Sequence, residues 1–209
     1  MMRLILASTS PRRREILSLL GVPFEAIDPP FEEIISESLP IDQEVFEFAA
    51  GKALSVAATH RDAIVIGSDT MISIDGEKLG KPKDVAEAKR MLRELGGKSH
   101  RIYTAVAIVD GAGGQGLRGI EEVSVRMRAY SEQEIEDYIA CGESLDKAGA
   151  YSIQGEGSRL IESIDGDYLA AVVRPLRPIA GYLKSRRIDI AVDVDGLYEE
   201  RTYRNWSRF

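Results

Sequence analysis

Cysteine and histidine are scarce in this chain. Its 209 residues include one cysteine, Cys141, and two histidines, His60 and His100. A single cysteine excludes an internal disulfide framework and fits a reducing compartment, so we expect a cytoplasmic protein. With so few candidate ligands, we expect no zinc site built from histidine and cysteine.

Two further absences concern membranes and nucleic acids. No apolar run approaches the length of a membrane span, and residues 1–20 lack the apolar segment and cleavage site of a signal peptide. The formal net charge is −7, whereas nucleic-acid coats and membrane-surface proteins need a basic surface. We therefore expect no nucleic-acid or membrane partner, and a local role for any basic cluster.

The rest of the composition is that of a globular α/β protein. Hydrophobic residues make up 44% and charged residues 29% of the chain, which is long enough for a sizeable core. The residue patterns predict strands near residues 4–7, 22–27, 63–67, 70–74, 77–79, 100–110, 121–130 and 168–173. They predict helices over residues 11–20, 42–59, 85–95, 132–140 and 178–187. This interleaving predicts a mixed sheet, and motifs from both halves of the chain favour two lobes with a cleft.

The first predicted strand runs directly into a helix start. Ser10 suits the N-cap and Pro11 the first helical position. The segment Arg12-Arg13-Arg14 follows, although cations at a helix N-terminus oppose the macrodipole by about 0.3–1 kcal/mol each. With Ser8 and the free backbone N–H groups, these arginines would bind a phosphate or carboxylate; alternatively, they point into solvent.

Asp69 is the strongest catalytic candidate. It follows the most apolar run of the chain, residues 63–67, and precedes Met71-Ile72. A carboxylate between two buried segments costs several kcal/mol unless it is paired or bound to a metal. The alternative is an aspartate in a turn.

Three further segments carry weaker signals. Lys52 falls on the apolar face of the second predicted helix, where it is either a functional inward lysine or one whose stem alone is buried. The turn Gly80-Lys81-Pro82 places a lysine near a strand end. Residues 147–157 are rich in glycine but lack the known nucleotide-binding spacings, and Gln154 could read an amide or a base edge.

Taken together, these motifs resemble the Maf family of nucleotide pyrophosphatases, in family order over about residues 3–187. The matching segments are Ser8-Thr9-Ser10-Pro11-Arg12-Arg13, Glu32-Glu33, Lys52, Gly67-Ser68-Asp69-Thr70, Gly80-Lys81-Pro82 and Ala148-Gly149-Ala150-Tyr151-Ser152-Ile153-Gln154-Gly155. The family's usual Asn-Val-Val-Gly-Leu-Pro is replaced here by Ala170-Ala171-Val172-Val173-Arg174-Pro175-Leu176.

The resemblance implies a fold and an activity. The expected fold is α/β and two-lobed, with an elongated mixed sheet flanked by helices around a central cleft, similar to inosine triphosphate pyrophosphatases. The expected activity is hydrolysis of a nucleoside triphosphate to the monophosphate and pyrophosphate with a divalent metal, by a cytoplasmic enzyme that is often a homodimer. The domain would cover residues 1–187, followed by a C-terminal extension, 188–209, of unknown role.

The family pattern also implies roles for single residues: Asp69 is the proton acceptor, and Arg13, Lys52 and Lys81 surround the phosphates. The chemistry of the residues agrees with this pattern. Glu33 with Asp69 could supply the oxygen ligands that Mg²⁺ or Mn²⁺ needs, and either Asp69 or water on that metal would activate the nucleophile. The residues that would hold the triphosphate are Ser8, Arg12, Arg13, Lys52 and Lys81.

The substrate branch follows from Arg12, Thr70 and Gln154, which match the branch that acts on dTTP and UTP rather than on methylated GTP. Two alternatives stay open at this point. One is a non-catalytic, nucleotide-sensing regulator of cell division. The other is a house-cleaning pyrophosphatase for modified pyrimidine, non-standard purine or methylated purine nucleotides.

Overall fold

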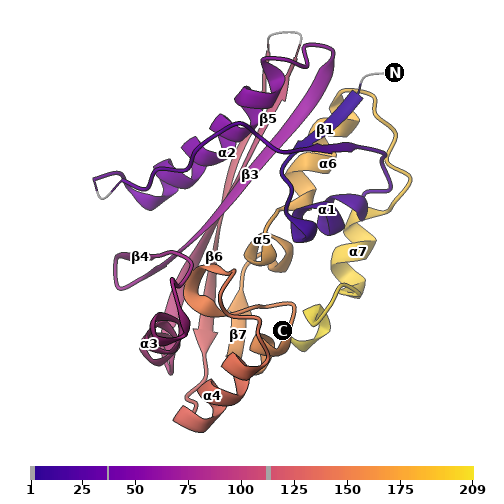
Figure 1. Ribbon diagram of the computed structural model, residues 1–209. Coiled ribbons are helices and arrows are strands. Elements are labelled where there is room, and N and C mark those ends of the chain that lie inside the picture. The colour runs from indigo at the N-terminus through magenta and orange to yellow at the C-terminus, as the bar shows by residue number, and fades with distance from the viewer. Residues whose placement is uncertain (1–2, 37, 112–113) are drawn as a thin grey trace. The chain divides into compact units, whose positions relative to one another are not determined.

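The structure is a computed structural model that describes residues 3–36, 38–111 and 114–209 (Figure 1). In chain order its strands and main helices are β1 (Arg3–Ala7), α1 (Pro11–Ser18), β2 (Glu25–Ile27), α2 (Ile41–Ala57), β3 (Ala63–Ile74), β4 (Glu77–Leu79), α3 (Val85–Leu95), β5 (Ser99–Asp110), β6 (Gly114–Met127), α4 (Glu132–Ala140), β7 (Ile161–Asp165), α5 (Tyr168–Val172), α6 (Leu176–Ser185) and α7 (Val194–Glu200). Among the described helices, none has the length and apolar character needed to cross a membrane.

Seven strands form one sheet in the order β2-β1-β3-β5-β6-β7, with β4 paired to β3. Strand β1 is parallel to both of its neighbours, so that Leu6 lies opposite Ala26 on one side and Ile66 on the other. Strands β4 and β7 are antiparallel to β3 and β6. The prediction of a mixed α/β sheet is confirmed.

The chain divides into two compact units, in agreement with the two lobes expected from the sequence. The first unit comprises Met1–Thr70, Thr104–Glu121 and Val173–Glu200. The second comprises Met71–Tyr103, Glu122–Val172 and Arg201–Phe209. Strands β3, β5 and β6 therefore each contribute residues to both units.

The first unit begins with the strand-to-helix turn that the sequence predicts. Strand β1 is buried from Leu4 to Ala7, and Pro11 starts helix α1 directly after the turn. The Ser10 side chain caps this helix by accepting from the backbone N–H of Arg13. The turn thus fixes where the arginines in the first turn of α1 lie relative to the end of β1.

The second unit contains a tight hairpin and a pair of packed helices. Asp75 and Gly76 connect β3 to β4 with positive φ angles of 52° and 89°, as the Asp-Gly pair predicts. Helix α3 buries one apolar face and packs against α4 (Figure 1). Ser131 and Glu134 form the predicted capping box at the start of α4.

Residues 168–172 form helix α5, so the prediction of a strand over residues 168–173 is wrong. The Asp167 carboxylate accepts hydrogen bonds from the backbone N–H groups of Leu169 (2.8 Å) and Ala170 (3.1 Å), which caps a helix start. All five residues of α5 are buried. A fully buried helix has no polar face, and a short apolar run therefore has the same pattern as a buried strand.

Candidate active site

Asp69 lies inside the continuous strand β3, so the alternative of an aspartate in a turn is wrong. Its side chain is only 8% exposed. Oδ1 accepts a hydrogen bond from Lys52 Nζ at 2.6 Å and another from Arg13 Nη2 at 3.1 Å. Two cations therefore compensate the cost of burying this carboxylate, as its position in the sequence requires.

Lys52 reaches Asp69 because helix α2 packs very closely on β3. The contact point is Gly67, where an added Cβ would lie only 2.1 Å from the carbonyl oxygen of Ala49. Only a glycine allows this approach. The Lys52 side chain is 6% exposed with its ammonium group inside, so the predicted inward direction is confirmed and the alternative of an ammonium group in solvent is wrong. The functional role of Lys52 stays a prediction.

Glu33 also pairs with the ammonium group of Lys52, from a loop that precedes α2. The loop is anchored by Phe31, whose ring packs edge-on against Phe48 at 6.2 Å between centroids. A Cβ at Gly51 would overlap the same ring, 2.1 Å from Cε2. The Glu33 side chain is 47% exposed, so the paired carboxylates of Glu33 and Asp69 differ strongly in their access to water.

The strand-to-helix turn contributes a hydroxyl and the arginines. Ser8 is buried, and its Oγ accepts from the backbone N–H of Ser10 at 3.2 Å. Arg13 is directed toward Asp69, so the alternative of a solvent-directed arginine is wrong at this position. Arg12 is partly buried, whereas Arg14 is exposed.

Arg174 is a site residue that the sequence reasoning missed. It is fully buried, and no partner for its Nε, Nη1 or Nη2 is found in the part of the chain that the structure describes. Burial, together with repulsion from Arg13, lowers the pKa of Arg174 to about 9. The available signal was the arginine itself, a charged residue in an apolar run where the family pattern has none.

Two hydroxyl groups of β3, those of Ser68 and Thr70, link the strand that carries Asp69 to neighbouring segments. Ser68 Oγ donates to the carbonyl oxygen of Val173 at 3.1 Å, which ties the residue before Arg174 to the strand that carries Asp69. Thr70 Oγ1 lies 3.0 Å from Thr104 Oγ1. We call Arg13, Glu33, Lys52, Asp69 and Arg174 the charged cluster.

Lys81 and Gln154 belong to the second unit, whereas all other predicted site residues belong to the first. Lys81 is exposed in the turn that follows β4. Gln154 is half-buried, and its Nε2 donates to the hydroxyl of Tyr203. Tyr203 is thus a second residue that the sequence reasoning missed. It lies 49 residues from Gln154 along the chain, so no local sequence pattern connects the two.

The carboxylates of the charged cluster fit a hard divalent cation. Within residues 3–36, 38–111 and 114–209, no group of three or more His, Cys, Asp and Glu side chains could enclose a metal ion. Mg²⁺ does not need such a cage, because it binds through one or two carboxylates together with substrate phosphates and water. Glu33 and Asp69, which meet at Lys52 Nζ, are a donor pair of that kind.

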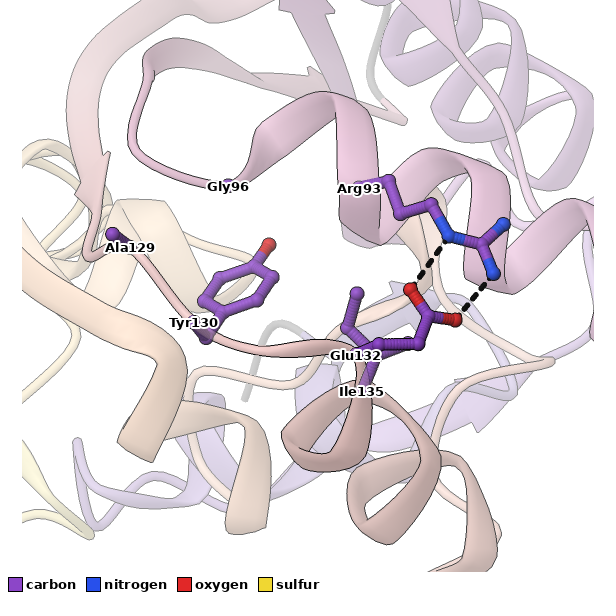
Figure 2. A pocket seen from close by; sticks show the side chains of 6 residues that line it. All are labelled: Arg93, Gly96, Ala129, Tyr130, Glu132 and Ile135. Atoms are coloured by element: carbon purple, nitrogen blue, oxygen red, sulfur yellow. Dashed lines mark hydrogen bonds and ion pairs between the residues drawn. The ribbon is translucent and has the colours of Figure 1, made fainter.

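Two surface pockets lie away from the predicted site residues. Figure 2 shows one of them, in the second unit, where the Arg93 guanidinium and the Glu132 carboxylate hold each other through two hydrogen bonds. The other, in the first unit, has Arg118 stacked over the ring of Phe46 at 4.1 Å. In both pockets the arginine is already engaged by a neighbouring side chain, so neither arginine is freely available to an anionic ligand.

A family model and relatives of known name point to the same protein family. The family described as Maf-like protein matches residues 3–186. A dTTP/UTP pyrophosphatase of Bacillus cereus (strain ZK / E33L) is 44% identical over 190 residues, covering 91% of this chain and 98% of that protein. A dTTP/UTP pyrophosphatase of Bacillus cytotoxicus is 45% identical over 185 residues, covering 88% and 95%. The solved structure of a HAM1 protein from Coxiella burnetii covers 90% of this chain and 97% of its own, at 14% identity and a TM-score of 0.46, which is too low to establish a shared fold.

Proposed function

The chain belongs to the Maf-like protein family, and we propose that it hydrolyses dTTP and UTP to the nucleoside monophosphate and pyrophosphate. The observation that carries this proposal is the uncompensated positive charge of the charged cluster. Three cations, Arg13, Lys52 and Arg174, lie with two carboxylates, one of them half exposed. An unpaired buried group costs about 1–3 kcal/mol, and more when it is charged. An anionic ligand such as a triphosphate would remove that cost.

Asp69 acts as the proton acceptor for the attacking water. Lys52 and Arg13 both bond to Oδ1 and thereby fix the orientation of the carboxylate. The same cations, with Arg174, balance the charge that spreads over the phosphoryl oxygens during the reaction. Ser8, Arg12 and Lys81 complete the set of phosphate-binding residues in this proposal.

Glu33 and Asp69 would hold the divalent ion, Mg²⁺ or Mn²⁺, which supplies charge neutralisation at the phosphates when bound. Lys52 bonds to both carboxylates and keeps them together. Gln154, with Thr70 and Arg12, would select the base. Its amide offers both a donor and an acceptor for the O4 and N3–H edge of uracil or thymine.

A pyrophosphate-release assay on a nucleotide panel tests the proposal. The panel contains dTTP, UTP, CTP, ATP, GTP and a methylated GTP, each with Mg²⁺ and with Mn²⁺. We expect the highest kcat/KM for dTTP and UTP, because a site built to bond one base edge rejects a base that leaves its groups unpaired. No release from any nucleotide would favour a regulatory role, and a purine as the best substrate would contradict the pyrimidine assignment alone.

The remaining predictions belong to the same proposal. We propose a catalytic domain of residues 1–187 that works as a homodimer in the cytoplasm. Light scattering on the purified protein tests the dimer. A fusion to a fluorescent protein tests the location.

A further inference from the structure

Residues 201–209 lie beyond the part of the chain that matches the family, and they are packed into the second unit. Trp206 is buried and stacks on the ring of Tyr168, with centroids 5.4 Å apart and planes 11° apart. Phe209 packs on the same tyrosine at 6.1 Å. This end of the chain therefore has a defined place in the second unit.

Asn205 joins the docked extension to the backbone on both sides of Gln154. Its Nδ2 donates to the carbonyl oxygens of Ile153 and Gly155, each at 3.3 Å. An amide nitrogen carries two N–H donors and a carbonyl oxygen only accepts, so the two carbonyl groups determine which end of the Asn205 amide faces them. The backbone of Asn205 has φ +56°, a left-handed conformation that asparagine adopts more readily than most residues.

The loop around Gln154 is held at its two ends by residues inside the family match. The backbone N–H of Ser152 donates to the hydroxyl of Tyr138 at 3.0 Å. The backbone N–H of Glu156 donates to the carboxylate of Glu143, also at 3.0 Å. The family part of the chain thus supports the ends of the loop, and the extension supports its middle.

We infer that Asn205 is a positioning residue that holds Gln154 in place for the base. This inference rests on the proposed function, in which Gln154 bonds to the base. The backbone torsions of Gln154 lie between the two carbonyl groups that Asn205 bridges, and they set the direction in which the side chain leaves the loop. Without the bridge these torsions are freer, and the amide spends part of its time out of reach of the base. This holds whichever end of the Gln154 amide faces the base.

Asn205→Gly tests the inference, because glycine keeps the left-handed backbone and removes both donors. The matched control is Arg201→Gly, at another extension residue with a positive φ of 50°, whose side chain bonds to Phe209 and not to the loop. The readouts are KM and kcat for UTP in the pyrophosphate-release assay. We expect Asn205→Gly to raise KM by about fivefold, the value of one hydrogen bond, and to keep kcat. Arg201→Gly should change neither.

A double-mutant cycle with Gln154→Ala separates positioning from a general loss of structure. Since Asn205 acts through Gln154, adding Asn205→Gly to Gln154→Ala should leave KM as it is in Gln154→Ala alone. A merely structural role would raise KM by the same factor in both backgrounds and would overturn the inference. An unchanged KM in Asn205→Gly, or an equal rise in Arg201→Gly, would overturn it as well.

Failure of the proposed function gives a different result, because the parent protein would then release no pyrophosphate from any nucleotide. Calorimetric Kd values for UTP, measured on the same set of proteins, would in that case decide the role of Asn205, since the expected factor is the same. A parent protein that does not bind UTP at all would overturn the inference together with the proposed function.

Discussion

The charged cluster and the group formed by Gln154, Tyr203 and Asn205, which we call the glutamine cluster, use opposite chemistry. In the charged cluster, buried guanidinium, ammonium and carboxylate groups compensate one another incompletely. In the glutamine cluster, neutral amides and hydroxyls bond to each other or to the backbone. Charge suits phosphates, which differ little between nucleotides, whereas neutral directional bonds suit bases, which differ in the donors and acceptors along their edges. The first cluster should therefore control rate and the second should control selectivity.

Asp69→Asn should have the largest effect on rate. The amide keeps the size of the side chain but removes the proton acceptor, so we expect kcat to fall by about 10²–10⁴-fold. Pyrophosphate release measures the loss, and circular dichroism checks the fold. Asp62→Asn, at an exposed aspartate of the same unit, is the control. A folded Asp69→Asn protein with near-parental kcat would refute the role of this residue.

Lys52→Ala should come next, with effects on both rate and stability. It leaves Glu33 and Asp69 without the ammonium group they share, and breaking a buried pair costs about 3–5 kcal/mol. We expect a lower Tm and a kcat/KM reduced by roughly 10²-fold. Lys89→Ala, which removes a partly exposed lysine of α3 that pairs with Glu136, should change neither. A lower Tm with parental kinetics would assign Lys52 to packing alone.

Gln154→Glu should alter selectivity more than rate. A carboxylate accepts but does not donate, so it cannot reproduce the pattern of the amide toward O4 and N3–H. We expect the preference for UTP over CTP to fall by about one to two orders of magnitude. Gln133→Glu, on α4, makes the same chemical change at an exposed position and should keep the preference.

Arg174→Leu should weaken substrate binding and stabilise the fold. Leucine removes a buried cation for which the described residues supply no hydrogen-bond partner, so Tm should rise. The loss of one phosphate ligand should raise KM by about tenfold. Arg177→Leu, at an exposed arginine near the start of α6, is the control. A lower Tm with unchanged KM would show that Arg174 serves packing.

The smallest effect on activity is expected at His100, a neutral group of the second unit. Its Nε2 lies 2.7 Å from the Tyr151 hydroxyl, and burial lowers the pKa of His100 from 6.5 to about 4. Between these pH values the unfolded chain binds a proton that the folded chain does not. The free energy of unfolding should therefore fall as the pH falls from 6.5 to 4, by up to ~3 kcal/mol.

Urea unfolding between pH 4 and 7 measures this contribution. His100→Gln should flatten the pH dependence over that range relative to the parent protein. Equal slopes in the parent protein and in His100→Gln would contradict the assignment to His100. The substitution should not change the UTP to CTP ratio at pH 7, which keeps this test independent of the residues around Gln154.

Local chemistry explains most of what the sequence predicted. Ser10 and Pro11 define the start of α1, and Asp75-Gly76 defines the hairpin, because each needs only its chain neighbours. Asp69 was found because a carboxylate between apolar runs requires a partner. For Lys52 the sequence left two alternatives, an inward functional lysine or one whose stem alone is buried. The close packing of α2 on β3 places its ammonium group inside, on Asp69.

What the sequence did not reveal depends on tertiary context. Helix α5 is buried on all sides, so its residues are all apolar and show no helical periodicity. The one local sign of a helix is Asp167, whose carboxylate caps its start. Arg174 became a candidate only because it is fully buried and its guanidinium has no hydrogen-bond partner among the described residues, and the sequence shows neither fact. Tyr203 is 49 residues away from Gln154 along the chain, and no periodicity links them.

Gly67 has a consequence for the order in which the site can form. An ordered pair between Lys52 and Asp69 requires α2 to lie against β3 with no side chain between them. A loosely collapsed chain, in which helix and strand exist but are not yet in contact, would keep these two charges apart and in water. Activity should therefore appear only with the last close packing of this unit, so that pyrophosphate release reports on native packing more stringently than helix content does.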